Sequence, residues 1–115
     1  MKTNKLLQLI QEQGGATLTK SLRAKSFNKG YQVALHGTEA IIDYTSPLFK
    51  AIIKAQQKQL AKGEYLGLWL NEENGKVYID KSIYIANRSQ AIKLAKDNKQ
   101  ISILNWATMK TIKTN

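Results

Sequence analysis

Cysteine is absent from this 115-residue chain, and no run of apolar residues approaches the length of a membrane span. Without cysteine, neither a disulfide framework nor a thiolate metal site can form, which suits a reducing compartment. The N-terminal residues also lack the long apolar core of a signal peptide. We therefore expect a cytoplasmic protein with no membrane partner.

Residues that carry catalysis are scarce. The single histidine, His36, lies in a predicted strand, and no serine occupies the strand-turn-helix context of a hydrolase nucleophile. The usual spacings of metal ligands are missing. Gly14-Gly15 follows a predicted helix, whereas phosphate-binding glycine loops precede one. We predict that the protein is not an enzyme and has no catalytic residues, metal site or cofactor.

A small metal-dependent nuclease is the alternative that retains some support. Acids at Glu64, Glu72, Glu73 or Asp80, together with Lys81, could bind a divalent ion and orient water. Nucleases with such a pattern usually carry the acid and the lysine two residues apart on one strand face. Asp80 and Lys81 are adjacent and point to opposite faces, so the pattern disfavours cleavage.

Acidic residues are few, and the imbalance of charge is large. Eight Asp and Glu against eighteen Lys and Arg give a net charge of +10. Such a field favours anionic partners, either nucleic acid or an acidic protein surface. Only Arg23 and Arg88 can make forked contacts with phosphate or guanine, because the other basic residues are lysines. The alternative is that surplus lysine only keeps the chain soluble.

A predicted helix at residues 47–62 carries lysine at every fourth position. Ser46-Pro47 is a typical helix start and Gly63 a typical stop. Lysines four apart repel each other slightly, and a solvated face usually relieves this with glutamate. Residues 45–63 contain no acid, which indicates an anionic partner, although AT-rich codon usage would give the same composition. The predicted anion-binding ladder consists of Lys50, Lys54, Lys58 and Lys62.

A second basic segment, residues 20–30, is predicted to be a mobile loop between two strands. It contains no acid, and its basic residues are Lys20, Arg23, Lys25 and Lys29. Phe27 lies among them, and a basic loop with an aromatic residue can hold single-stranded nucleic acid by charge and stacking. Trp106, in a predicted turn, is a second candidate for stacking. The alternative is that both rings anchor the core, as Trp69 would also do.

Periodicity predicts one α+β domain over residues 1–115. Alternation over 65–70 and 77–80, around a turn at 71–75, predicts a β-hairpin. Asn87 and Gln90 form a capping box that begins a helix at 88–98. Leu6, Leu7, Leu9 and Ile10 define a short N-terminal helix, and further strands are predicted at 16–19, 31–36, 101–104 and 110–112. We expect an antiparallel sheet of five or six strands, covered on one face by the helices at 47–62 and 88–98.

Four motifs follow one another in the second half of the chain. They are G-L-W-L from Gly67, G-K-V-Y-I-D from Gly75, N-R-S-Q-A-I-K-L-A-K from Asn87 and N-K-Q-I-S-I from Asn98. Together they resemble a group of small phage and mobile-element proteins with a GxW…GKxYxD hairpin, an NRxxAxxLA helix and a QxxI strand. Leu66 and Met109 stand where that group usually has glycine. The group has no agreed activity, so the resemblance implies a phage or prophage setting, in the host cytoplasm.

These observations favour a non-enzymatic phage or prophage accessory protein. Its Lys-rich surface would bind nucleic acid or a nucleic-acid-handling host complex. The alternative is an inhibitor of a host defence system, of the anti-CRISPR or anti-restriction type, which binds a protein and needs no DNA contact. The small nuclease is third.

Overall fold

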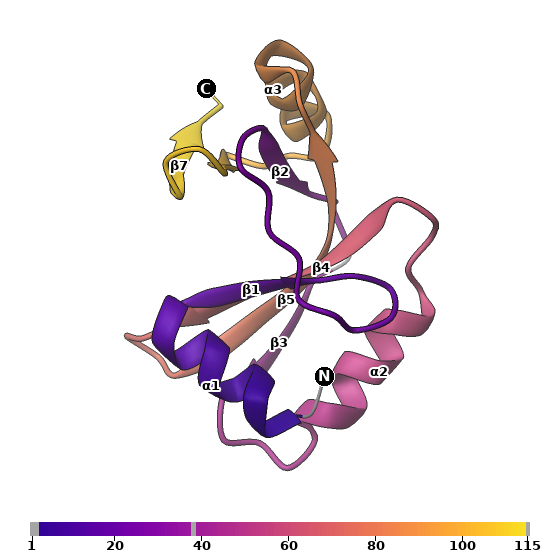
Figure 1. Ribbon diagram of the computed structural model, residues 1–115, viewed down its shortest axis with the longest axis vertical. Helices are drawn as coiled ribbons and strands as arrows, with labels where there is room; N and C mark the ends of the chain where they lie inside the picture. Colours follow the sequence, from indigo (N-terminus) through magenta and orange to yellow (C-terminus); the bar gives the residue numbers. More distant parts are fainter. Residues whose placement is uncertain (1–2, 38, 115) are drawn as a thin grey trace.

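The computed structural model describes residues 3–37 and 39–114 as an α+β fold, in which three helices pack on an open, seven-stranded antiparallel sheet (Figure 1). The helices are α1 (Thr3–Gln13), α2 (Phe49–Lys58) and α3 (Arg88–Asp97). The strands are β1 (Gly15–Leu18), β2 (Tyr31–Ala34), β3 (Ala40–Asp43), β4 (Glu64–Asn71), β5 (Lys76–Ile85), β6 (Ser102–Asn105) and β7 (Lys110–Lys113).

Strand β5 is the centre of the sheet. Along one edge it pairs with the whole of β4, which confirms the predicted hairpin and its turn at 71–75. Along its other edge the first half of β5 pairs with β3 and the second half with β2. The remaining order is β1 beside β4, and β6 then β7 beyond β2. Side chains alternate along a strand, so odd-numbered residues of β5 face one side of the sheet and even-numbered residues the other.

The larger core cluster lies where α1 and α2 cover the odd-numbered side of β5. Figure 1 shows both helices on the same side of β1, β4 and β5. Leu6 and Ile10 from α1 and Phe49 and Ile53 from α2 are buried there. The strands contribute Leu18, Ile42, Leu66, Leu68, Val77 and Ile79. The apolar stripe predicted for the N-terminal helix therefore packs on the sheet.

A smaller cluster forms at the other end of the sheet, beneath α3. Ala91 and Ala95 are fully buried and pack against Val33 of β2 and Ile103 of β6. Ile85, the last residue of β5, packs against this cluster. Ile85 is odd-numbered, like the β5 residues of the larger cluster, so all three helices lie on one side of β5. Within the residues that the structure describes, the other side carries no helix.

The predicted sheet lacked one strand, β3. Its four residues alternate, with Ile42 buried and Ile41 exposed, but so short a run is a weak signal. The pairing that makes it a strand is with Val77 and Tyr78, more than thirty residues away in the chain. The sheet therefore has seven strands instead of five or six.

Helix α2 is shorter than the predicted 47–62. Ser46 and Pro47 belong to a turn before the helix, in which Ser46 Oγ accepts a hydrogen bond from the Leu48 N–H at 3.1 Å. At the other end Gln59 is the C-cap, and its N–H bonds back to carbonyls of the last turn. Gly63 has a φ of 85° and lies in the turn that leads into β4. Lys62 is therefore outside the helix.

Helix α3 begins at the predicted N-cap. The Asn87 side chain accepts a hydrogen bond from the Gln90 N–H at 3.0 Å. The Asn87→Ala variant should lose about 1 kcal/mol of unfolding free energy, because one amide of the first turn then has no side-chain partner. Urea unfolding followed by circular dichroism measures the loss. Ser89→Ala, an exposed change inside the same helix, is the control and should leave stability nearly unchanged or slightly higher.

Candidate nucleic-acid interface

Helix α2 presents three lysines of the predicted ladder to solvent. Lys50, Lys54 and Lys58 are exposed, and none of them forms an ion pair within the part of the chain that the structure describes. Lys62, also exposed, follows in the turn before β4 instead of extending the helix. Three ammonium groups therefore span about 12 Å along α2, at 1.5 Å per residue.

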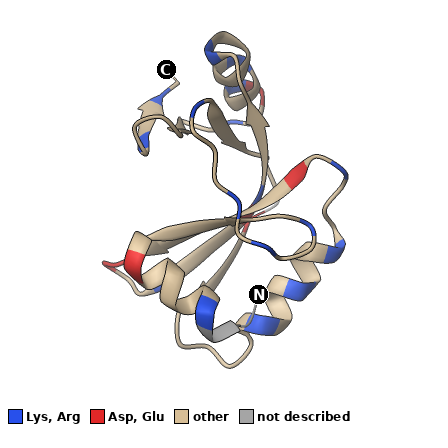
Figure 2. Ribbon diagram, viewed as in Figure 1, with Lys and Arg blue, Asp and Glu red and all other residues tan. Residues whose placement is uncertain are grey.

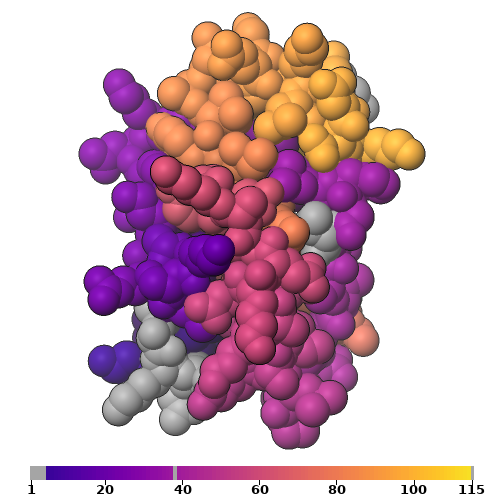
Figure 3. Space-filling view, turned by 90° about the vertical axis from the view of Figure 1, so that its right-hand side faces the viewer, coloured from indigo at the N-terminus to yellow at the C-terminus, as the bar shows by residue number. Residues whose placement is uncertain are grey.

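The loop between β1 and β2 lies against α2. The Gln57 side chain, on α2, donates a hydrogen bond to the Lys20 carbonyl at 2.7 Å. A tight turn lies beside it, in which the Thr19 N–H donates to the Arg23 carbonyl and the Arg23 N–H donates to the Thr19 side-chain hydroxyl. Figure 2 shows blue positions both on α2 and on the adjacent loop. In Figure 3, turned to this side, the purple loop and the pink residues of α2 and the turn after it form one face. The structure thus joins the two basic segments.

The second half of the loop runs towards a different part of the sheet. The Lys25 ammonium lies 5.1 Å from the centroid of the Phe27 ring. The Lys29 carbonyl accepts a hydrogen bond from the Tyr84 hydroxyl at 2.7 Å. Tyr84 is an even-numbered residue of β5, on the side without helices. Lys25 and Lys29 therefore lie towards the β5 end of the loop, whereas Lys20 lies at the α2 end.

The two rings proposed for stacking on bases are already packed within the protein. Phe27 stacks on Tyr84 with ring centroids 3.9 Å apart, and it meets Tyr65 and Trp106 edge to face. Trp106 is only 7% exposed. A buried aromatic ring contributes more to stability than an exposed one, and both rings serve here to hold the loop and the last hairpin on the sheet. Trp106 is thus buried, and Tyr84 covers one face of the half-buried Phe27 ring. Stacking of either ring on a base stays a prediction.

Trp69 was expected to lie in the core, but it is exposed. Its side chain is 56% exposed and lies 5.4 Å from Tyr78, measured between ring centroids. In β4 the residues Leu66, Leu68 and Leu70 alternate with it and face the larger core cluster. That alternation is visible in the sequence, and it was the signal that Trp69 faces the side without helices.

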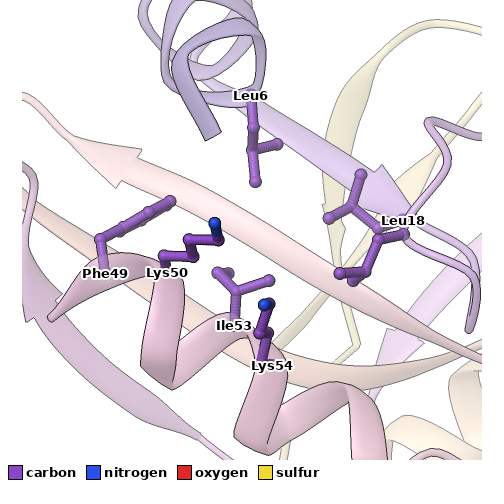
Figure 4. A pocket seen from close by; sticks show the side chains of 7 residues that line it. Leu6, Leu18, Phe49, Lys50, Ile53 and Lys54 are labelled. Carbon is purple, nitrogen blue, oxygen red and sulfur yellow. The ribbon is translucent and has the colours of Figure 1, made fainter. Parts of the chain in front are cut away.

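A small pocket opens between α1 and α2 beside two of the lysines. Its volume is about 40 Å³, and Figure 4 shows the apolar side chains around it with the Lys50 and Lys54 ammonium groups at its edge. The remaining lining residues are Leu6, Leu18, Leu22, Phe49 and Ile53. The pocket can hold a small apolar group, while the two cations attract an anion next to it.

Asp80 is the acid that the fold perturbs most. Burial raises its pKa from 3.8 to about 6; a hydrogen bond from Ser82, 2.6 Å long, lowers it and the charge of Glu39 raises it further. A Cβ atom at Gly67 would lie 2.7 Å from the Asp80 carboxylate, so only glycine permits this close packing. Lys81 is paired opposite Leu66 and faces the larger core cluster.

The nuclease alternative needs an acid and a lysine on one face of a strand, together with acids that can bind a divalent ion. Asp80 and Lys81 are on opposite faces of β5, as the sequence predicted. Among the described residues, no three His, Asp or Glu side chains gather as metal ligands. His36 is exposed just after β2, and its N–H bonds to the Asn98 side chain at 3.0 Å.

No helix in residues 3–37 and 39–114 has both the length and the apolar character needed to cross a bilayer. No protein family, curated protein or solved structure matches this chain.

Proposed function

We propose that this protein is a non-enzymatic accessory protein of a phage or prophage and binds nucleic acid through the surface formed by α2 and the β1–β2 loop. We call it the α2–loop surface; its basic residues are Lys20, Arg23, Lys50, Lys54, Lys58 and Lys62. The phage setting rests on the resemblance of the hairpin and α3 motifs. The binding function rests on the structure of this surface.

One observation carries the binding function: the fold joins two basic, acid-free segments that are far apart in the sequence. The hydrogen bond from Gln57 to the Lys20 carbonyl ties them together. Residues 44–63 and 13–38 contain no Asp or Glu, so the ammonium groups have no neighbouring carboxylates from their own segments. Closely spaced cations without acids raise the local concentration of a polyanion.

The α2–loop surface predicts a steep dependence of binding on salt. Each phosphate that a lysine neutralises releases condensed counterions, so affinity falls as salt rises. With about five contacted phosphates, the slope of log K against log salt should be about −4.5 on duplex DNA and about −3.5 on a single strand. Fluorescence anisotropy with labelled DNA and RNA of equal length, titrated over a range of sodium chloride, measures it. A flat salt dependence would contradict the proposal.

The pocket beside Lys50 and Lys54 favours a second candidate, a protein-binding inhibitor of a host defence system. An apolar pocket flanked by two cations suits an acidic protein surface that presents a small aliphatic side chain. Nucleic acid offers no such side chain. A pull-down from host lysate, with and without nuclease treatment, separates the two functions. A partner that disappears with nuclease treatment supports nucleic-acid binding. A partner that survives it, but is lost when Lys50 and Lys58 are changed to glutamate, supports the inhibitor.

A further inference from the structure

On the side of the sheet without helices, three large side chains lie in one row across adjacent strands. Ile41 of β3 is opposite Tyr78 of β5, and Tyr78 is opposite Trp69 of β4. Residues directly opposite in an antiparallel pair have Cβ atoms about 5 Å apart, so the three side chains are contiguous. The next residue in the row, Gly15 of β1, has no side chain and leaves Trp69 uncovered on that side. We call Ile41, Tyr78 and Trp69 the aromatic row.

Much of the aromatic row is exposed to solvent. Ile41 is 51% and Trp69 56% exposed, although both are large apolar residues. Figure 1 shows α1 and α2 only on the other side of β1, β4 and β5. Contiguous apolar side chains exposed in this way are typical of an interaction surface, whereas single exposed ones are common on any protein.

The charge around the aromatic row is opposite to that of the whole protein. The segments 39–43 and 72–80, which contain Ile41 and Tyr78 and adjoin Trp69, hold five of the eight acids and a single lysine. That lysine, Lys76, pairs with Asp43 at 3.5 Å. None of the other four acids forms an ion pair in the part of the chain described by the structure. Three of these acids, Glu39, Glu72 and Glu73, are exposed, whereas the carboxylate of Asp80 is largely buried.

We propose that the aromatic row is a second binding surface and takes a basic protein segment in which arginine or lysine alternates with an aliphatic residue. The aliphatic side chains would pack on Ile41 and Tyr78. A guanidinium or ammonium group would lie over the indole of Trp69, where the negative face of the ring attracts a cation. The surrounding carboxylates complement the same cations and repel nucleic acid.

The aromatic row is separate from the α2–loop surface. Ile42, Val77 and Leu68 are the neighbours of the row along each strand, and they face α2 in the larger core cluster. The two surfaces are therefore on opposite sides of the sheet. Nucleic acid on one side and a basic protein on the other can be bound together, which would make this protein a connector between them.

Short synthetic peptides of equal length test the proposal. One alternates arginine with isoleucine, a second replaces arginine by glutamate, and a third replaces isoleucine by serine. Fluorescence of the exposed Trp69 reports binding, and Trp69→Phe, which retains the buried Trp106, identifies the signal as that of Trp69. The arginine–isoleucine peptide should bind about tenfold more tightly than either of the others.

Variants of the full chain locate the site, with binding followed by calorimetry. Trp69→Ala and Ile41→Ser should each weaken binding of the arginine–isoleucine peptide about tenfold. Ile101→Ser changes a more exposed aliphatic residue outside the row, 75% against 51% for Ile41, and should leave affinity unchanged. Equal affinity for the three peptides, or wild-type affinity in Trp69→Ala, would overturn the proposal.

Two further outcomes would assign the aromatic row to another occupant. A dimer in sedimentation experiments that is lost in Trp69→Ala would show that a second copy of this chain covers the row. Loss of DNA or RNA binding in Trp69→Ala would show that the row belongs to the nucleic-acid interface. Either result would overturn the basic partner, and only the second would alter the α2–loop surface.

Discussion

The Asp80→Asn variant should be about 3 kcal/mol more stable than the wild-type protein near neutral pH. In the folded protein burial raises the pKa of Asp80 to about 6, whereas the carboxyl ionises near its ordinary value of 3.8 when the chain is unfolded. Above pH 6 the folded protein must therefore carry a buried charge that costs free energy. The amide is uncharged and can still accept the hydrogen bond from Ser82.

The sign of the pH dependence follows from the same two pKa values. Between pH 3.8 and about 6 the folded state keeps a proton on Asp80 that the unfolded state has lost. The contribution of Asp80 to unfolding free energy therefore falls as pH rises through this window, and the full penalty remains above it. The wild type and the Asp80→Asn variant should differ most above pH 6 and converge near pH 4.

Urea unfolding at a series of pH values measures the difference between the two proteins. All other groups are the same in both proteins, so the difference reports on Asp80 and its interaction with Glu39. Asp43→Asn is the control, because Asp43 is exposed and its ion pair with Lys76 should contribute less than about 1 kcal/mol. Equal stability of wild type and Asp80→Asn at neutral pH would show that the carboxylate is not buried at a cost.

The second prediction concerns the α2–loop surface. Lys50→Glu with Lys58→Glu should reduce nucleic-acid affinity on the order of 100-fold near 0.1 M salt, since two counterion-releasing contacts are lost and two repulsions are added. The fold should be unharmed. Both changed positions are four residues from Lys54 on the same helix, so they create favourable pairs worth a few tenths of a kcal/mol each.

A control variant with the same change in net charge distinguishes a binding site on α2 from a general effect of the protein's net charge. Lys93→Glu with Lys96→Glu makes the same change on exposed positions of α3, away from the α2–loop surface. Both residues are inside the helix, where glutamate is a favourable residue. Anisotropy titrations of both variants should show a large loss only for the α2 variant. Equal losses would mean that the protein binds through net charge and that α2 is not a site.

Met109 and Leu66 stand where the group of phage proteins that the sequence resembles usually has glycine. Met109 occupies the turn between β6 and β7 with a φ of 57°, a conformation that glycine adopts readily and other residues rarely. The hairpin nevertheless forms, with four pairs from Ser102↔Lys113 to Asn105↔Lys110. Leu66, at the other position, is fully buried in the larger core cluster. This fold thus accommodates a residue other than glycine at both positions.

Local features of the chain were sufficient for most of its elements. Alternation of Leu66, Leu68 and Leu70 predicted the strand and its buried face, because side chains of a strand alternate wherever that strand lies. Asn87 predicted the start of α3, since a cap acts on amides within three residues. The absence of cysteine and of acids in 45–63 limited the chemistry before any fold was known.

Tertiary structure alone decided which of these residues meet. Strand β3 forms because it pairs with β5, which is distant in the sequence. Lys20 lies beside α2 because the Gln57 side chain donates a hydrogen bond to its carbonyl. The two tryptophans cannot be told apart from composition, yet Trp106 is buried and Trp69 exposed. The β1–β2 loop packs on Trp106 through Phe27, whereas Trp69 lies on the side of the sheet without helices. Burial, and with it the raised pKa of Asp80, depends on contacts between strands that no local pattern specifies.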